Sequence, residues 1–185
     1  INGIINYAQI LIDSGQSEAH ANFLRAIIKE GQRIAGITRN LLEFSRKREE
    51  SPEPVDIPGL IRHSFELIAH QYQLDGITLV EEYDKHLPLA FCNPQQLQQV
   101  LLNVFSNARY ALNQRYPTAD NNKRIVISVT GKGREGRRTV HIAITDYGTG
   151  IEHHIMDRLM DPFFSTKAKG EGTGLGLSIS HNLIQ

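Results

Sequence analysis

The sequence has almost no cysteine, no net charge and no long apolar run, and each absence excludes a class of protein. Cys92 is the single cysteine among 185 residues, so the chain has no disulfide framework, which suits a reducing cytosol. The 20 basic and 20 acidic side chains cancel, which argues against nucleic acid or an anionic membrane as a partner. No apolar run approaches the roughly 20 residues that cross a bilayer. We therefore expect a cytoplasmic chain without membrane contact, and any inner-membrane anchor of its parent protein lies outside it.

The N-terminal region has the pattern of two helices. Apolar residues keep helical spacing over 1–13, Ser14 and Gly15 supply a turn, and a second helix is expected over 17–50 with apolar steps of four and three. The apolar stripe is too wide for a lone surface helix. We expect a helical hairpin that dimerises into a four-helix bundle, and the alternative is a hairpin packed on its own domain.

Residues 51–54, Ser-Pro-Glu-Pro, break the second helix and predict a boundary between domains at 1–50 and 51–185. The second region is expected to be α+β. Helices are predicted from Asp56 to about Gly76 and from the Asn93-Pro94 cap onward. Strands are predicted at 77–83 and 89–92, and at 125–129 paired with 140–144.

Two amides stand on the helix that Asn93 caps. Asn103 and Asn107 are four residues apart and share one face beside the apolar stripe. An amide oxygen is a suitable neutral ligand for Mg²⁺ that bridges triphosphate oxygens. Taken alone, two such residues are more often solvent-facing or capping, so this pattern needs further support.

Asp146, Gly148 and Gly150 follow a strand with alternating apolar residues, which delivers a carboxylate to the strand end. A plain β-turn is the alternative interpretation. A partly buried aspartate accepts a hydrogen bond from the amino group of adenine and rejects the carbonyl of guanine.

A glycine-dense run leads directly into the last apolar helix, with Gly170, Gly172, Gly174 and Gly176 alternating with other residues. Exposed backbone N–H groups at a helix start favour phosphate. The run differs from a P-loop, because no Lys-Ser/Thr pair follows it. A flexible linker is the alternative, although Leu175 and Leu177 at the junction argue against one.

Between these glycine motifs lie two aromatic residues and two lysines, Phe163, Phe164, Lys167 and Lys169. The pattern suggests a mobile lid, in which the rings pack it down and a lysine approaches phosphate oxygens. Core packing explains the aromatic residues equally well.

Together these motifs resemble the sensor histidine kinases of two-component systems, in particular the nitrogen-regulator type. The amide pair, the Asp146 motif, Phe163-Phe164 and the Gly172-to-Gly176 run look like the N, G1, F and G2 boxes, in family order. Glu30-Gly31-x-Arg33-Ile34 and residues 40–46 are similar to the second helix of the family's dimerisation and phosphotransfer domain.

The resemblance implies a helical hairpin followed by a two-layer α+β sandwich of the Bergerat type. It further implies a kinase that passes the γ-phosphate of Mg-ATP to a stem histidine and on to the receiver domain of a response regulator. Asn107 would be the magnesium ligand, with Asn103 beside it, and Asp146 would accept from adenine. The nucleotide would also contact Gly148, Gly150, Phe163, Phe164, Lys167, Gly172, Thr173, Gly174, Leu175 and Gly176.

The sequence departs from the family pattern at its beginning and its end. The family's His-Glu-x-Asn-Asn-Pro sequence is absent, and none of the eight histidines precedes an acidic residue. Ile1 already has the pattern of a mid-helix residue, so we expect a fragment that lacks the phosphoacceptor and, beyond Gln185, the last strands of the sandwich. Such a fragment is expected to bind ATP without autophosphorylation.

Three functions remain open. The first is a histidine kinase core, and the second is a nucleotide-binding or scaffold module that has lost catalysis and signals through dimer geometry. The third is an ATPase of the gyrase and MutL type, which resembles this helix but has a glutamate where Asn103 stands. Because an amide cannot act as base toward water, Asn103 favours phosphoryl transfer over hydrolysis.

Overall fold

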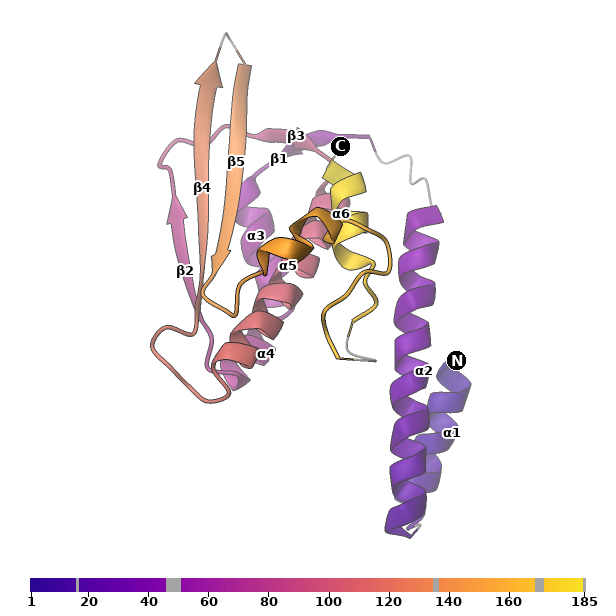
Figure 1. Ribbon diagram of the computed structural model, residues 1–185. Helices are drawn as coiled ribbons and strands as arrows, with labels where there is room; N and C mark the ends of the chain where they lie inside the picture. The colour runs from indigo at the N-terminus through magenta and orange to yellow at the C-terminus, as the bar shows by residue number, and fades with distance from the viewer. Residues whose placement is uncertain (16, 46–50, 135–136, 169–171, 185) are drawn as a thin grey trace. The chain divides into compact units, whose positions relative to one another are not determined.

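The computed structural model describes residues 1–15, 17–45, 51–134, 137–168 and 172–184 (Figure 1). The chain forms two compact units, one with residues 1–49 and 161–175, the other with 50–160 and 176–185. We call them the hairpin unit and the α/β unit and describe each by itself. The domain limits expected from the sequence, 1–50 and 51–185, stay a prediction. Within the described ranges, no helix is long and apolar enough to cross a membrane.

The hairpin unit begins with two antiparallel helices, α1 (Asn2–Asp13) and α2 (Glu18–Ser45). They match the predicted helices, except that residues 46–50 lie outside the described part of the chain. Small residues let the helices approach closely: Ala8 and Ala21 are buried, and a Cβ added to Gly31 would lie 2.8 Å from Ile5 Cγ1. The two helices of the hairpin therefore lie close together at Ala8, Ala21 and Gly31, where the contact residues are small.

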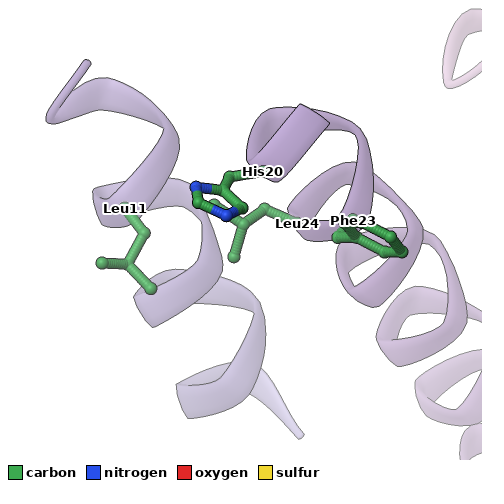
Figure 2. Close-up of a pocket in the computed structure, with 4 residues that line it drawn as sticks. All are labelled: Leu11, His20, Phe23 and Leu24. Carbon is green, nitrogen blue, oxygen red and sulfur yellow. The ribbon is translucent and has the colours of Figure 1, made fainter. Parts of the chain in front are cut away.

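At the end of the hairpin where α1 leads into α2, the helices leave a hollow of about 230 Å³. Figure 2 shows its lining, with Leu11 on α1 and with His20, Phe23 and Leu24 on α2. Many large apolar side chains of the hairpin are exposed, namely Ile1, Ile4, Tyr7, Ile10 and Leu11 on the α1 side, and Phe23, Ile27 and Ile34 on α2. We call these eight residues the apolar hairpin surface.

The α/β unit contains a three-stranded sheet in the order β2, β4, β5. β2 (Thr78–Tyr83) runs parallel to β4 (Arg124–Arg134), which runs antiparallel to β5 (Arg137–Asp146). Ile127 pairs with Ile144, and Val129 pairs with Ile142. The predicted pairing of 125–129 with 140–144 is therefore confirmed, and the strands extend beyond it because the two arms of the β4–β5 hairpin continue to pair.

Three helices, α3 (Ile57–Glu66), α4 (Ala69–Leu74) and α5 (Pro94–Arg115), cover one face of this sheet (Figure 1). Alternate residues of β4 face them and are completely buried, as expected for a strand with a period of two. The core joins the strands to the helices through Ile57, Ile61, Tyr72, Leu101, Phe105, Ala108, Leu112, Ile125, Ile127 and Val129. This layer of helices on a sheet confirms the predicted two-layer α+β fold.

Two predicted segments differ from the structure. The single helix expected from Asp56 to Gly76 is broken into α3 and α4, because Ile68 leaves helical geometry with a φ of −122°. This break directs the side chain of Tyr72 toward the core, where it is 1% exposed.

The segment expected as a helix break and domain boundary contains β1 (Glu53–Val55), which pairs antiparallel with β3 (Ala90–Cys92). Pro54 lies within β1, opposite Phe91. A proline is tolerated there because both strands of a two-stranded sheet are edge strands.

Candidate functional site

Helix α5 is the element on which the site is built. Asn93 caps it, with the side-chain Oδ1 accepting from the N–H of Gln96 at 3.0 Å, and Pro94 follows at the first helical position. Asn103, Asn107 and Ala111 are spaced by four residues, so they lie along one face of the helix. We call this the amide face of α5.

The first residue of the amide face holds the last helix, α6 (Gly176–Ile184). The Nδ2 group of the half-buried Asn103 donates to the carbonyl of Gly176 at 3.3 Å and to Oγ of Ser180 at 3.1 Å. A Cβ added to Gly176 would lie 3.7 Å from Asn103, so this contact does not require glycine. Asn103 therefore fixes the N-terminus of α6 beside the amide face.

The last residue of the amide face holds the loop that follows β5. A Cβ added to Gly148 would lie 2.6 Å from both the carbonyl carbon and the Cβ of Ala111, so only glycine fits. The N–H of Thr149 donates to the carbonyl of Ala111 at 3.3 Å. Gly150 has a φ of +70°, which favours glycine. The two glycines thus have separate roles, close approach for the first and backbone conformation for the second.

Asp146 is the last residue of β5, as the sequence predicts, but it is exposed rather than partly buried. Its position at the end of an edge strand explains the exposure. Its Oδ1 accepts from the N–H of Gly148 at 2.9 Å. Within the described residues no donor reaches Oδ2, so one carboxylate oxygen is available to a ligand.

A further residue, which the sequence reading missed, ties this loop to the end of α5. Arg115 Nη1 donates to the carbonyl oxygens of Tyr147 at 3.1 Å and Gly148 at 3.0 Å. The only signal in the sequence is a basic residue in the last turn of the helix, where such residues commonly bind backbone carbonyls.

Asn107 is half-buried and lies between these two attachments. At a rise of about 1.5 Å per residue, the amide face from Asn103 to Ala111 is about 12 Å long. The structure therefore places Asn103 and Asn107 on the helix face to which Gly176 and the loop of Asp146, Gly148 and Gly150 are attached. Within the described residues, no group of three His, Cys, Asp or Glu side chains is placed to hold a metal ion.

The remaining candidate residues lie in the loop 161–175, which belongs to the hairpin unit. Its two arms lie side by side. A Cβ added to Gly174 would lie 2.4 Å from the carbonyl carbon of Phe163, and one added to Gly172 would lie 2.6 Å from Ser165 Oγ and 3.1 Å from Lys167 Cδ. Thr173 Oγ1 accepts from the N–H of Leu175 at 3.4 Å. The glycines therefore allow the two arms to come together.

The aromatic pair of this loop differs from the prediction. Phe164 is half-buried, but Phe163 is 69% exposed, so the expectation that both rings pack the loop down is wrong for Phe163. Its φ of +67° is rare for a bulky residue, and the backbone conformation at this position leaves the ring exposed. Lys167 is half-buried, and Lys169 to Glu171 lie outside the described residues. The place of this loop in the site stays a prediction.

Comparisons with known proteins cover both regions of the chain. Residues 92–185 match the histidine kinase-, DNA gyrase B- and HSP90-like ATPases, and residues 1–50 match the His Kinase A (phospho-acceptor) domain. The chain is 34% identical over 185 residues to the sensor histidine kinase ZraS of Escherichia coli strain K12, covering all of this chain and 37% of ZraS.

It is also 30% identical over 187 residues to the sensory histidine kinase/phosphatase NtrB of Proteus hauseri, covering all of this chain and 51% of NtrB. The crystal structure of full-length ShkA in complex with AMPPNP has 25% identity and a TM-score of 0.71, covering 98% of this chain and 37% of ShkA. The chain thus spans about half or less of the length of these relatives. It belongs to the family of histidine kinase-, DNA gyrase B- and HSP90-like ATPases, among the sensor histidine kinases of two-component systems.

Proposed function

We propose that the chain binds Mg-ATP along the amide face of α5 and serves as the core of a protein histidine kinase. The observation that carries the proposal is the attachment of two motifs to one helix face. The start of α6 is bound at Asn103 and the loop after β5 at Ala111, so Asn107 lies between an adenine acceptor and a helix N-terminus.

The residues present suit the parts of the nucleotide. Asp146 Oδ2 accepts from the adenine amino group, while Gly148 lets the loop after β5 pack on α5 and Gly150 gives this loop its positive φ. The amide oxygen of Asn107 is a hard neutral ligand for Mg²⁺. The N–H groups at the start of α6 favour phosphate, and the AMPPNP complex of ShkA supports a nucleotide as the ligand.

The four motifs in family order assign residues of the loop 161–175 to the phosphate side of the nucleotide. Lys167 supplies positive charge, and the glycine arm supplies backbone N–H groups through Gly172, Thr173, Gly174, Leu175 and the adjoining Gly176. Phe163 and Phe164 shape the other arm. Bound Mg-ATP supplies the phosphoryl group that goes to a histidine of the phospho-acceptor domain and then to an aspartate of a response-regulator receiver domain.

We propose further that the hairpin forms a homodimer. The apolar hairpin surface includes Phe23 and Tyr7, each 71% exposed, and a single chain leaves this surface in water. So many large exposed apolar residues on two helices favour an interaction site. A second hairpin buries them in a four-helix bundle, with packing along the heptad-like spacing of α2.

Calorimetric titration with ATP in the presence of Mg²⁺ tests the nucleotide site. Asp146→Asn should weaken binding by about 1–3 kcal/mol, because the amide presents a donor where adenine needs an acceptor. Asp157→Asn, another exposed aspartate of the α/β unit, is the matched control and should bind as the unchanged chain does. Absence of ATP uptake by the folded, unchanged chain would refute the proposal.

Labelling with γ-³²P ATP tests the transfer. No histidine of this chain precedes an acidic residue, so we expect no label on the chain as it stands. A variant with His-Glu-Ala-Asn-Asn-Pro placed directly before Ile1 should become labelled. If the variant binds ATP and stays unlabelled, the chain is better described as a nucleotide-binding scaffold that signals through dimer geometry.

A further inference from the structure

The side of α5 opposite the amide face has its own set of attachments. Phe105, Arg109 and Asn113 are also spaced by four residues, and Arg109 lies about 200° around the helix axis from Asn107, at about 100° per residue. All three are bound by α4 or by Asp75, the residue that caps its C-terminus.

Four hydrogen bonds make this attachment, on three successive turns of α5. The buried hydroxyl of Tyr72 donates to the carbonyl of Phe105 at 2.7 Å. Arg109 donates through Nε to Asp75 Oδ2 at 2.5 Å and through Nη1 to Gln71 Oε1 at 2.9 Å. Asn113 Nδ2 donates to the same Oδ2 of Asp75 at 2.6 Å. We call Gln71, Tyr72 and Asp75, with their partners on α5, the α4 clamp.

Asp75 is the centre of the clamp and is held there as an anion. Burial raises the pKa of Asp75, but hydrogen bonds from Arg109 and Asn113 and the charges of Arg109 and Lys123 outweigh it, so the pKa lies below its ordinary value. The side chain of Asp75 is only 20% exposed, and Lys123 is 2% exposed. Charge-assisted hydrogen bonds in such surroundings are short and strongly directional.

The apolar contacts of α5 supply no direction, and its other hydrogen bonds to the α/β unit, made by Asn103, Ala111 and Arg115, all lie on the amide face. Its apolar side chains pack against α3 and β4 in the core, and apolar burial is non-directional, so packing alone tolerates small rotations and shifts of the helix. Mg²⁺ requires its ligands at about 2.0–2.1 Å in nearly octahedral geometry. Rotation of α5 therefore affects Asn107 strongly, whereas Asp146 lies on β5 and does not turn with the helix.

We propose that the α4 clamp is the positioning element for Asn107, and that it sets the rotation of α5 at which the Asn107 amide meets nucleotide-bound Mg²⁺. The clamp residues touch neither nucleotide nor metal and act through the helix. This inference rests on the proposed Mg-ATP site and specifies which residues outside that site determine its magnesium dependence.

The experiment measures ATP affinity of the full chain by calorimetry, once with Mg²⁺ and once with EDTA. The ratio of the two affinities is the magnesium gain. Asp75→Ala removes the acceptor shared by Arg109 and Asn113 and should reduce the magnesium gain about tenfold, while affinity in EDTA changes less than about twofold. Asp75→Asn keeps an acceptor oxygen in place and should retain most of the gain.

Two further variants guard the interpretation. Tyr72→Phe keeps the buried ring and removes only the hydroxyl, so it should also reduce the magnesium gain. This variant tests the clamp even if Asp75→Ala does not fold. Glu66→Ala removes an exposed carboxylate paired with His63 at 3.7 Å and should leave both affinities unchanged. Circular dichroism at the titration temperature establishes that each variant is folded.

The outcomes separate this inference from the proposed function. An unchanged magnesium gain in folded Asp75→Ala and Tyr72→Phe would overturn the clamp alone. A parallel loss of affinity with Mg²⁺ and with EDTA would also overturn it, because the clamp would then only stabilise the α/β unit. No ATP binding by the unchanged chain would overturn the proposed function, and the role of the clamp with it.

Discussion

The two units differ in where they keep their large apolar side chains. In the α/β unit Phe105, Ile125 and Ile127 are completely buried in one core between helices and sheet. In the hairpin, Tyr7 and Phe23 are 71% exposed, and among the described apolar side chains of α1 and α2 only Ala8 and Ala21 are buried. The α/β unit therefore has a core of its own, whereas we propose that the hairpin buries its apolar surface against a second chain. Stability should be intramolecular in the first and dependent on concentration in the second.

The largest effect that would test this contrast is a cavity in the α/β core. Phe105→Ala should reduce the free energy of unfolding of the α/β unit by about 3–5 kcal/mol, because the ring is completely buried. Denaturant unfolding measures the loss, and hydrogen–deuterium exchange shows where it occurs. Protection in α1 and α2 should not change. An equal loss of protection in the hairpin would mean that the two units do not unfold independently.

A second variant tests whether the loop after β5 must pack closely on α5. Gly148→Ala places a methyl group 2.6 Å from Ala111, which should cost about 1–3 kcal/mol of stability and weaken ATP binding. Gly133→Ala is the matched control, since an added Cβ there meets nothing within 4 Å. Thermal unfolding and calorimetry measure the stability and ATP affinity of both variants. Equal stability and affinity of the two would show that the loop accommodates the methyl group without cost.

The hairpin side of the contrast is tested by Phe23→Ser. Loss of an exposed aromatic residue should leave the folding of the α/β unit unchanged and raise the dimer dissociation constant about tenfold, as expected when a central interface residue is removed. Analytical ultracentrifugation measures the dissociation constant. Leu89→Ser, at a side chain that is 63% exposed in the α/β unit, is the control and should have no effect on association.

The smallest expected effect is a pH dependence that belongs to the α/β unit alone. Because the pKa of Asp75 in the folded chain lies below its ordinary 3.8, its charge contributes stability that is complete above that value. The contribution is lost as the pH falls through the lower folded-state pKa. Asp75→Asn should therefore flatten the acid limb of the stability curve of the α/β unit. Unfolding curves recorded at neutral and acidic pH compare this variant with the unchanged chain, and an equally steep acid limb in both would contradict the prediction.

Features set by neighbouring residues could be predicted from the sequence. The cap at Asn93, the carboxylate at the end of β5 and the α6 start at Gly176 all follow from local patterns. Contacts between distant residues could not be predicted, because nothing in the sequence pairs Asp75 with Arg109 or Arg115 with the carbonyl of Gly148. The motifs therefore indicated the chemistry of the site, and the structure supplied the attachments that position it.

The errors also have physical causes. Pro54 has the pattern of a helix breaker, and its tolerance in β1 depends on the absence of a further strand beside that edge, which a linear sequence does not reveal. Apolar spacing continues across Ile68, so the break between α3 and α4 has no signal in periodicity. The exposure of Phe163 follows from a positive φ, which is rare for phenylalanine.

The parallel pairing of β2 with β4 has a consequence for how the chain folds. Thr78 meets Arg124 only after the intervening chain, with β3 and all of α5, has crossed over. Closing so long a loop is entropically unfavourable, and non-local pairing slows folding. The contacts of α1 with α2 span a single short turn. During synthesis the hairpin should therefore form early, and its apolar surface will be exposed while the sheet of the α/β unit is still incomplete.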